Sequence, residues 1–136
     1  MSWITDRQTT IYSRVDAILT SKLGDKYEDL NVTMDNTLSQ EAMFPTVFIN
    51  FIGFRERGET LDGTSVNAGV MDVEVHVKTS NDQGMIVNQE VADCALDAFK
   101  TMHFRVQSQN IPLGNIDGVY ESVSRFTRTI GQGDVI

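Results

Sequence analysis

Three residues that could do acid–base or metal chemistry lie two positions apart in the sequence: Asp72, Glu74 and His76. Alternate residues of a β-strand share a face, so in a strand these side chains would line up about 7 Å apart. Carboxylates and an imidazole can bind a metal ion or act as general acids and bases. Ligands on a single strand diverge, however, and no fourth partner is evident. We therefore favour a solvated strand face, continued by Lys78, and predict no catalytic, cofactor-binding or metal-binding residue.

Other signatures of chemistry are absent from the sequence. There is no Walker A loop and no Gly-x-Ser-x-Gly elbow, and the one Gly-x-Gly, at 131–133, precedes no helix that could bind a phosphate. The single cysteine, Cys94, lies on an apolar stripe, where a small buried hydrophobic residue is expected. These absences favour a protein that works by binding.

Composition narrows the possible partners. The chain has 136 residues and a net charge of −8, which argues against a protein that grips phosphate backbones or seeks anionic lipids. An acidic surface would instead let DNA pass without sticking. No N-terminal apolar segment resembles a secretory signal, and no apolar run approaches the ~20 residues of a membrane helix. We expect one domain, folded in the cytoplasm, with no membrane partner.

Two helices are expected from apolar residues at helical spacing. The first covers residues 5–23, with Thr5 and Gln8 as a capping box and Gly24 as the stop. The second covers residues 82–102, after the N-cap signal Ser80-Asn81-Asp82. We expect its buried stripe to contain Cys94, and its polar residues, Asn88 among them, to lie elsewhere. The residues of that buried stripe are Val87, Val91, Cys94, Ala95, Ala98 and Met102.

Strands are expected at residues 31–36, 46–54, 67–79, 105–109 and 119–130, with turns at Asp62-Gly63, Pro112 to Gly114 and Asp117-Gly118. Strands that follow one another and few helices predict an α+β domain. Its antiparallel-rich or mixed sheet of about four or five strands would be packed by the two helices. The strands 46–54 and 67–79 would form a hairpin with a protruding charged loop at 55–64. Residues 131–136 are expected to be a flexible tail.

The stretch FPTVFINFIGF, residues 44–54, carries more apolar side chains than a half-buried strand needs. In a regular strand Val47, Ile49 and Phe51 would face the core, and Phe48, Ile52 and Phe54 would face the other way. A second apolar face on a soluble protein usually marks an interface. We therefore predict that Phe48, Ile52 and Phe54 form either a subunit interface or a second internal layer of the subunit, and take them as interface candidates. We also predict that the adjoining loop contacts a neighbouring subunit or another protein through Arg55, Glu56, Arg57, Glu59 and Asp62.

The order and type of these segments resemble the tail terminator, or tail-completion, proteins of long-tailed bacteriophages. The resemblance rests on Phe44-Pro45-Thr46-Val47 entering an apolar strand, the Arg-containing loop, the strand ending in residues 75–80, the second helix, and the closing stretch 119–126. It covers residues 4–130. The last strand departs from it, because Ser122, Ser124, Thr127 and Thr129 make that strand more polar than expected.

The resemblance implies a non-enzymatic virion protein assembled in the host cytoplasm. Such proteins form a ring, typically of six subunits, that caps the tail tube, stops its elongation and provides a surface for joining to the head. The implied partners are other copies of the chain, the tube protein and the neck proteins, with DNA only passing through the lumen. Two alternatives stay open: a head-side neck or connector protein, and a small ligand-binding or enzymatic domain that uses Asp72, Glu74 and His76.

Overall fold

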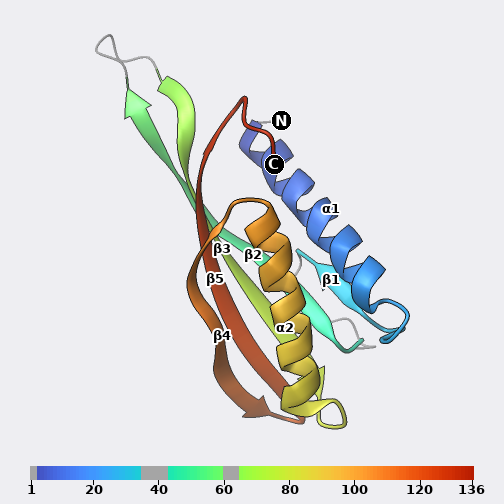
Figure 1. Cartoon of the computed structure of the whole chain (residues 1–136). Helices are drawn as coiled ribbons and strands as arrows, with labels where there is room; N and C mark the ends of the chain where they lie inside the picture. The colour runs from blue at the N-terminus through green and yellow to red at the C-terminus, as the bar shows by residue number, and fades with distance from the viewer. Residues whose placement is uncertain (1–2, 35–42, 60–64) are drawn as a thin grey trace.

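A computed structural model describes residues 3–34, 43–59 and 65–136, with backbone alone at 56–59 and 65–67. Seven elements follow in order: α1 (Trp3–Leu23), β1 (Asn31–Thr33), β2 (Thr46–Glu59), β3 (Ser65–Ser80), α2 (Gly84–Thr101), β4 (Arg105–Ile116) and β5 (Val119–Gly131). All five strands join one sheet in the order β1-β2-β3-β5-β4, in which β1 is parallel to β2 and the other pairs are antiparallel. Both helices lie against one face of this sheet (Figure 1). The prediction of an α+β fold with a mixed sheet and two helices is confirmed.

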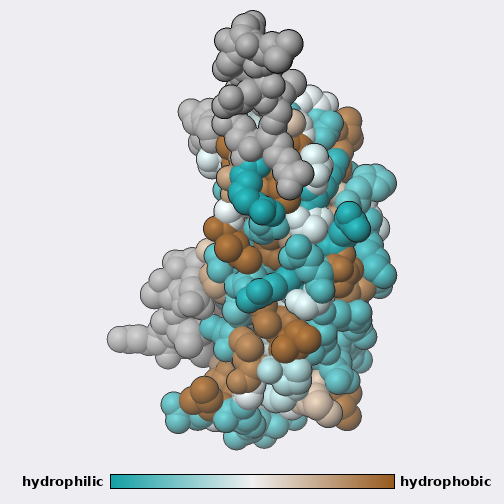
Figure 2. All heavy atoms as spheres, turned by 90° about the vertical axis from the view of Figure 1, so that its left-hand side faces the viewer, coloured by the Kyte–Doolittle hydropathy of each residue, from teal (hydrophilic) through white to brown (hydrophobic). Residues whose placement is uncertain are grey.

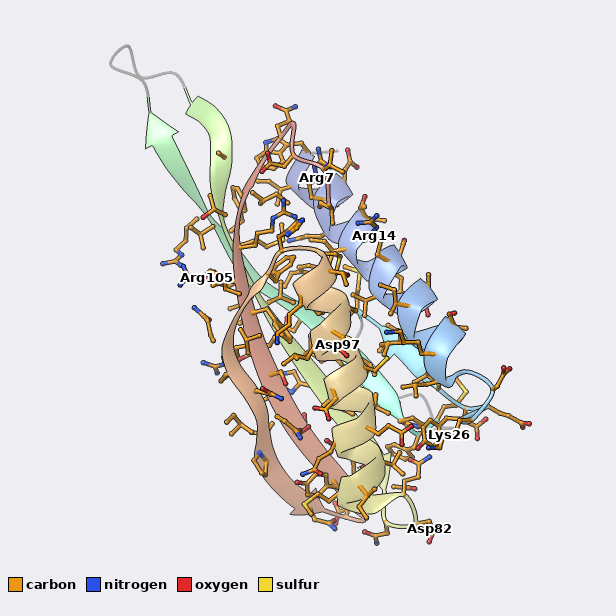
Figure 3. All side chains as sticks on the ribbon, in the orientation of Figure 1. Arg7, Arg14, Lys26, Asp82, Asp97 and Arg105 are labelled. Atoms are coloured by element: carbon orange, nitrogen blue, oxygen red, sulfur yellow. The ribbon has the colours of Figure 1, made fainter. Side chains whose placement is uncertain are left out.

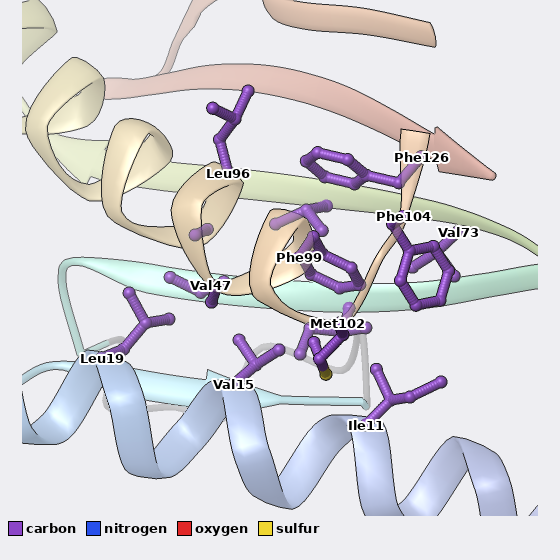
Figure 4. Packing of buried hydrophobic residues seen from close by; sticks show 14 of the residues in the cluster. Ile11, Val15, Leu19, Val47, Val73, Leu96, Phe99, Met102, Phe104 and Phe126 are labelled. Atoms are coloured by element: carbon purple, nitrogen blue, oxygen red, sulfur yellow. The ribbon is translucent and has the colours of Figure 1, made fainter. Parts of the chain in front are cut away.

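The hydrophobic core lies between the two helices and the sheet. Ile11, Val15 and Leu19 of α1 are fully buried, at the helical spacing that the sequence showed. Figure 4 shows them facing the same interior as Phe99 of α2. The Phe99 ring stacks on that of Phe126 from β5, with centroids 4.5 Å apart. This shared core holds both helices on the same side of the sheet.

β5 is a central strand of the sheet, although its residues are more polar than the resemblance led us to expect. It pairs with β3 on one side and β4 on the other. Ser122 and Ser124 are buried, and the hydroxyl of Ser122 donates to Asn88 Oδ1 at 2.5 Å. The prediction that Asn88 lies away from the buried face of α2 was wrong. Its side chain is fully buried because it bonds the sheet as well as filling space.

The β2–β3 hairpin is longer than predicted. Residues 55–59 continue β2 and pair with β3, so the predicted loop at 55–64 was too long by these residues. β5 pairs only with residues 68–80 of β3, and the hairpin therefore projects beyond the rest of the sheet (Figure 1). Arg57 is in register with Ala68, and Glu59 with Ser65. Polar side chains do not prevent backbone pairing between the two strands. Residues 60–64, including Asp62, lie outside the described residues.

Helix starts were also placed incorrectly. α1 begins at Trp3, so Thr5 lies inside the helix rather than capping it. α2 begins at Gly84, after the turn 81–83, and its N-cap residue Gln83 makes no side-chain capping bond. Gln83 Nε2 instead donates to the Phe44 carbonyl at 3.0 Å. The side chain of Gln83 thus bonds a residue distant in sequence and does not cap the helix.

The C-terminal residues lie against the helical layer. Ile136 is 8% exposed and belongs to the core cluster. The Arg14 guanidinium donates to the Ile136 backbone oxygen, and that of Arg7 to the Gln132 carbonyl. The flexibility predicted for residues 131–136 stays a prediction, but their position against α1 was not expected.

Candidate interaction surface

The face of the sheet opposite the helices has no helical layer within the described part of the chain. On β3, Met71, Val73, Val75 and Val77 are buried against the helices, as the alternation predicted. The side chains between them, Asp72, Glu74, His76 and Lys78, occupy the other face and are half-buried. We call this second side the open face. Figure 2 views the side of the molecule away from α1 and shows apolar groups set among polar ones.

Asp72, Glu74 and His76, which the sequence analysis assigned to a solvated strand face, lie on the open face and contact charged neighbours. Glu74 Oε2 lies 2.8 Å from Arg125 Nη2, and Glu74 Oε1 lies 3.3 Å from His76 Nε2. His76 Nδ1 is 2.8 Å from Glu121 Oε2 on β5. The imidazole therefore bridges two carboxylates, and an arginine balances one of them. These contacts place Glu74 and His76 in a network with Glu121 and Arg125 rather than around a common centre with Asp72.

Asp72 makes a separate ion pair nearer the hairpin. Its Oδ2 lies 3.2 Å from Arg55 Nη2, and the Arg55 side chain is 64% exposed. The other carboxylate oxygen of Asp72 is buried with no hydrogen-bond partner among the described residues. Arg55, predicted to lie on a loop, thus stands on β2 beside the open face. The same strand continues through the backbone of three more residues predicted to lie on that loop: Glu56, Arg57 and Glu59.

A β-bulge decides which of the three predicted interface residues reach the open face. Phe51 pairs with Val73 and Gly53 with Asp72, so Ile52 is an extra residue on β2. The side chain of Ile52 is 53% exposed. Phe48, before the bulge, stays on the open face, where its ring lies 5.6 Å from that of His76.

Phe54, after the bulge, returns to the face that the helices cover. Its ring packs against the core and meets Trp3 of α1 edge-on, with centroids 5.3 Å apart. The expectation that Phe54 points the same way as Phe48 and Ile52 was therefore wrong. The extra residue at Ile52 reverses the alternation that the expectation assumed.

β4 adds an apolar border that the sequence interpretation missed. The strand was predicted to end at residue 109, with a turn from Pro112 to Gly114, but it continues to Ile116 and turns at Asp117-Gly118, as predicted for that pair. Pro112 is tolerated because β4 is an edge strand. Ile111 and Leu113 are 47% and 49% exposed. They alternate with Pro112 and Gly114, whose turn-like composition concealed the strand.

A shallow pocket of about 320 Å³ lies where β4 borders the open face. Leu113, Ile116 and Val119 provide its apolar wall, and Lys78 and Glu121 are at its rim. With Phe48 and Ile52 on β2, the open face thus has apolar residues along both sides and compensated charges between them. Such a face suits contact with another macromolecule better than chemistry on a small substrate.

The remaining predicted features are placed as follows. Cys94 is buried on α2, as predicted, and burial raises the pKa of its thiol. Within the described residues, no group of three or more His, Cys, Asp or Glu side chains is arranged to hold a metal ion. None of the helices described is long and apolar enough to cross a membrane.

Comparison with known proteins gives no family assignment. No family model matches the chain, and no curated protein matches it.

Proposed function

We propose that this chain is a non-enzymatic tail terminator of a long-tailed bacteriophage, which forms a ring that caps the tail tube. The observation that carries the proposal is the open face, where Phe48 and Ile52 stand on the sheet with no covering layer among the described residues. The resemblance in the order of elements supplies the kind of assembly. The ring is expected to stop tube elongation and to present its other side to the neck proteins.

The architecture supports assembly in two ways. A ring needs a heterologous contact, in which one patch of a subunit meets a different patch of the next. The open face offers one such patch. The projecting β2–β3 hairpin offers a second means of contact, because an isolated two-stranded ribbon is only marginally stable in water and gains from a partner.

The acidic charge of −8 is consistent with the proposed place in the virion. A ring around a DNA conduit must let phosphates slide past, and like charge prevents them from binding. The same charge makes subunits repel one another at long range. Ring formation by such a chain is therefore expected to depend on a compensated surface such as the open face.

The test is assembly of the purified chain alone and together with the polymerising tube protein of the same phage. Native mass spectrometry and negative-stain electron microscopy are expected to show closed rings and shortened, capped tubes. The Ile52→Ser variant should remain folded, because Ile52 is half-exposed, and should fail to cap. Val135→Ser is the matched control, since Val135 is 85% exposed and lies away from the open face.

Two results would overturn the proposal. One is a chain that stays monomeric and leaves tube length unchanged when tube protein is present. The other is binding to portal or neck components with none to the tube, which would identify a head-side connector. Unfolding of the Ile52→Ser variant would show that the open face belongs to the subunit's own core.

A further inference from the structure

We infer that the open face of one subunit binds the exposed stripe of α2 on the next subunit. The inference rests on the proposed ring and names the two patches that meet in it. The α2 stripe consists of the exposed side chains that point away from the sheet: Ile86, Gln89, Asp93, Asp97 and Lys100. The inward side of the same helix carries Val91, Ala95 and Phe99, all buried.

The two patches lie on opposite sides of a two-layer subunit. In Figure 3, Asp97 is on α2, in the helical layer, whereas Arg105 points away from that layer on the far side of the sheet. Patches on opposite sides make a head-to-tail contact, which gives a ring when the rotation between successive copies closes and a helical filament when it does not. The contact also gives each sheet a helical layer on its second face, as in three-layer α/β proteins.

Charge favours this pairing. Four cationic and three acidic side chains stand on the open face among the described residues, so its net charge is +1 in a chain of −8. They are Arg55, Lys78, Arg105, Arg125, Asp72, Glu74 and Glu121. All other surfaces together are strongly acidic. The α2 stripe, with two aspartates and one lysine, has a net charge of −1 and is thus attracted to the open face of another copy.

The spacing of apolar and charged groups also matches. On α2, Ile86 and Asp93 are seven residues apart, about 10 Å along the helix axis. On the open face, Arg125 of β5 is in register with Glu74 of β3, and Glu74 is in register with Asn50 of β2. Ile52 lies two residues beyond Asn50, so Ile52 and Arg125 are about 12 Å apart. Ile86 can therefore pack on Ile52 while Asp93 meets Arg125, whose side chain is 56% exposed.

A second charged pair lies one helical turn further on. Asp97 is about 16 Å from Ile86 along the axis. Arg105, three strands away from Ile52, is about 15 Å from it. Ile86 is 76% exposed, a large apolar surface that the described part of the subunit does not cover. One apolar contact and two charged contacts would then fix the register of neighbouring subunits.

Cross-linking between two variants that each carry one introduced cysteine tests the pairing directly. Ile52→Cys and Ile86→Cys are mixed and treated with a short bismaleimide. The heterologous contact predicts a cross-linked dimer in the mixture and none in either variant alone. Cys94 should react little, because it is buried and its thiol pKa is raised by burial. A mixture of Ile52→Cys with Val135→Cys is the control and should give no product.

Two cross-linking results overturn the inference. A product from Ile52→Cys alone would show that two open faces meet, and no product in the Ile52→Cys and Ile86→Cys mixture would show that these patches do not meet. Rings that cap tubes without this cross-link would leave the proposed function standing and remove the inference. If the cross-link forms and tubes are not capped, the inference stands and the proposed function is removed.

An association assay adds a quantitative readout. Ile86→Asp should weaken self-association at least about tenfold, since it places a charge at the apolar centre of the contact. It should leave the fold intact, because an acidic residue near a helix N-terminus is favourable. Unchanged association of Ile86→Asp would overturn the inference.

Discussion

Replacing Asn88 with alanine should destabilise the fold by about 3 kcal/mol. Asn88 is fully buried on α2, and its Nδ2 donates to the Val77 carbonyl at 2.8 Å and more weakly to that of Tyr120 at 3.4 Å. Its Oδ1 accepts from the Ser122 hydroxyl. The side chain thereby ties the helix to β3 and β5, the two strands at the centre of the open face.

The magnitude follows from the hydrogen bonds that the substitution removes. Two good hydrogen bonds are worth about 1 kcal/mol each, and the buried Ser122 hydroxyl left without its acceptor costs about 1–3 kcal/mol. A partly filled cavity adds to this, and about 3 kcal/mol is a central value. For a chain of this size the melting temperature should fall by roughly 10 °C. Urea unfolding followed by circular dichroism measures the change.

A double-mutant cycle separates the hydrogen bond from the loss of volume. Ser122→Ala alone leaves Asn88 Oδ1 without a donor and should cost about 1–3 kcal/mol. Each single variant leaves the other partner without its hydrogen bond. The stability lost in the double variant should therefore be smaller than the sum of the two single losses, by about 1 kcal/mol or more. Gln89→Ala, next on the same helix and exposed, should change stability by less than about 0.5 kcal/mol. Additive effects at Asn88 and Ser122 would refute the reasoning.

Three further outcomes are expected from local geometry and charge. His103→Gly should stabilise by about 0.5–1 kcal/mol in thermal unfolding, since His103 ends α2 at φ 65°, where glycine is unstrained. Gly69→Ala should destabilise by about 1–3 kcal/mol, because a Cβ there would clash with the Arg55 carbonyl; an unchanged urea midpoint would contradict this. A hydrogen bond from Lys26 lowers the pKa of Glu90, so their pair stabilises above the ordinary carboxyl pKa and is lost as pH falls through the lowered value. Glu90→Gln should therefore lower the midpoint of thermal unfolding at neutral pH. At a pH below the lowered pKa of Glu90 it should leave that midpoint unchanged.

Periodicity in the sequence was sufficient for the elements that lie between core and solvent. The spacing of Ile11, Val15 and Leu19 located α1, and the alternation from Met71 to Val77 located β3. Such patterns are informative because a buried side and an exposed side impose a period on the sequence. The fold class followed from the order of these elements.

Signals that depend on distant partners were misread. Ser80-Asn81-Asp82 has the composition of a helix cap, yet residues 81–83 form a turn and α2 starts at Gly84, where Gln83 bonds Phe44 from another part of the chain. Asn88 has the polarity of a surface residue, yet it is buried because Val77 and Ser122 satisfy its amide. A polar residue can be buried wherever the fold supplies hydrogen-bond partners, and those partners are remote in sequence.

By itself the sequence determined that the chain is acidic, that it forms an α+β fold, and that residues 44–54 carry more apolar side chains than one strand face requires. Only the tertiary structure decided where those side chains go. The bulge at Ile52 sends Phe54 into the core beside Trp3 and leaves Phe48 and Ile52 on the open face. The physical reason is that a bulge is set by pairing with the neighbouring strand, and one added residue reverses every later side chain.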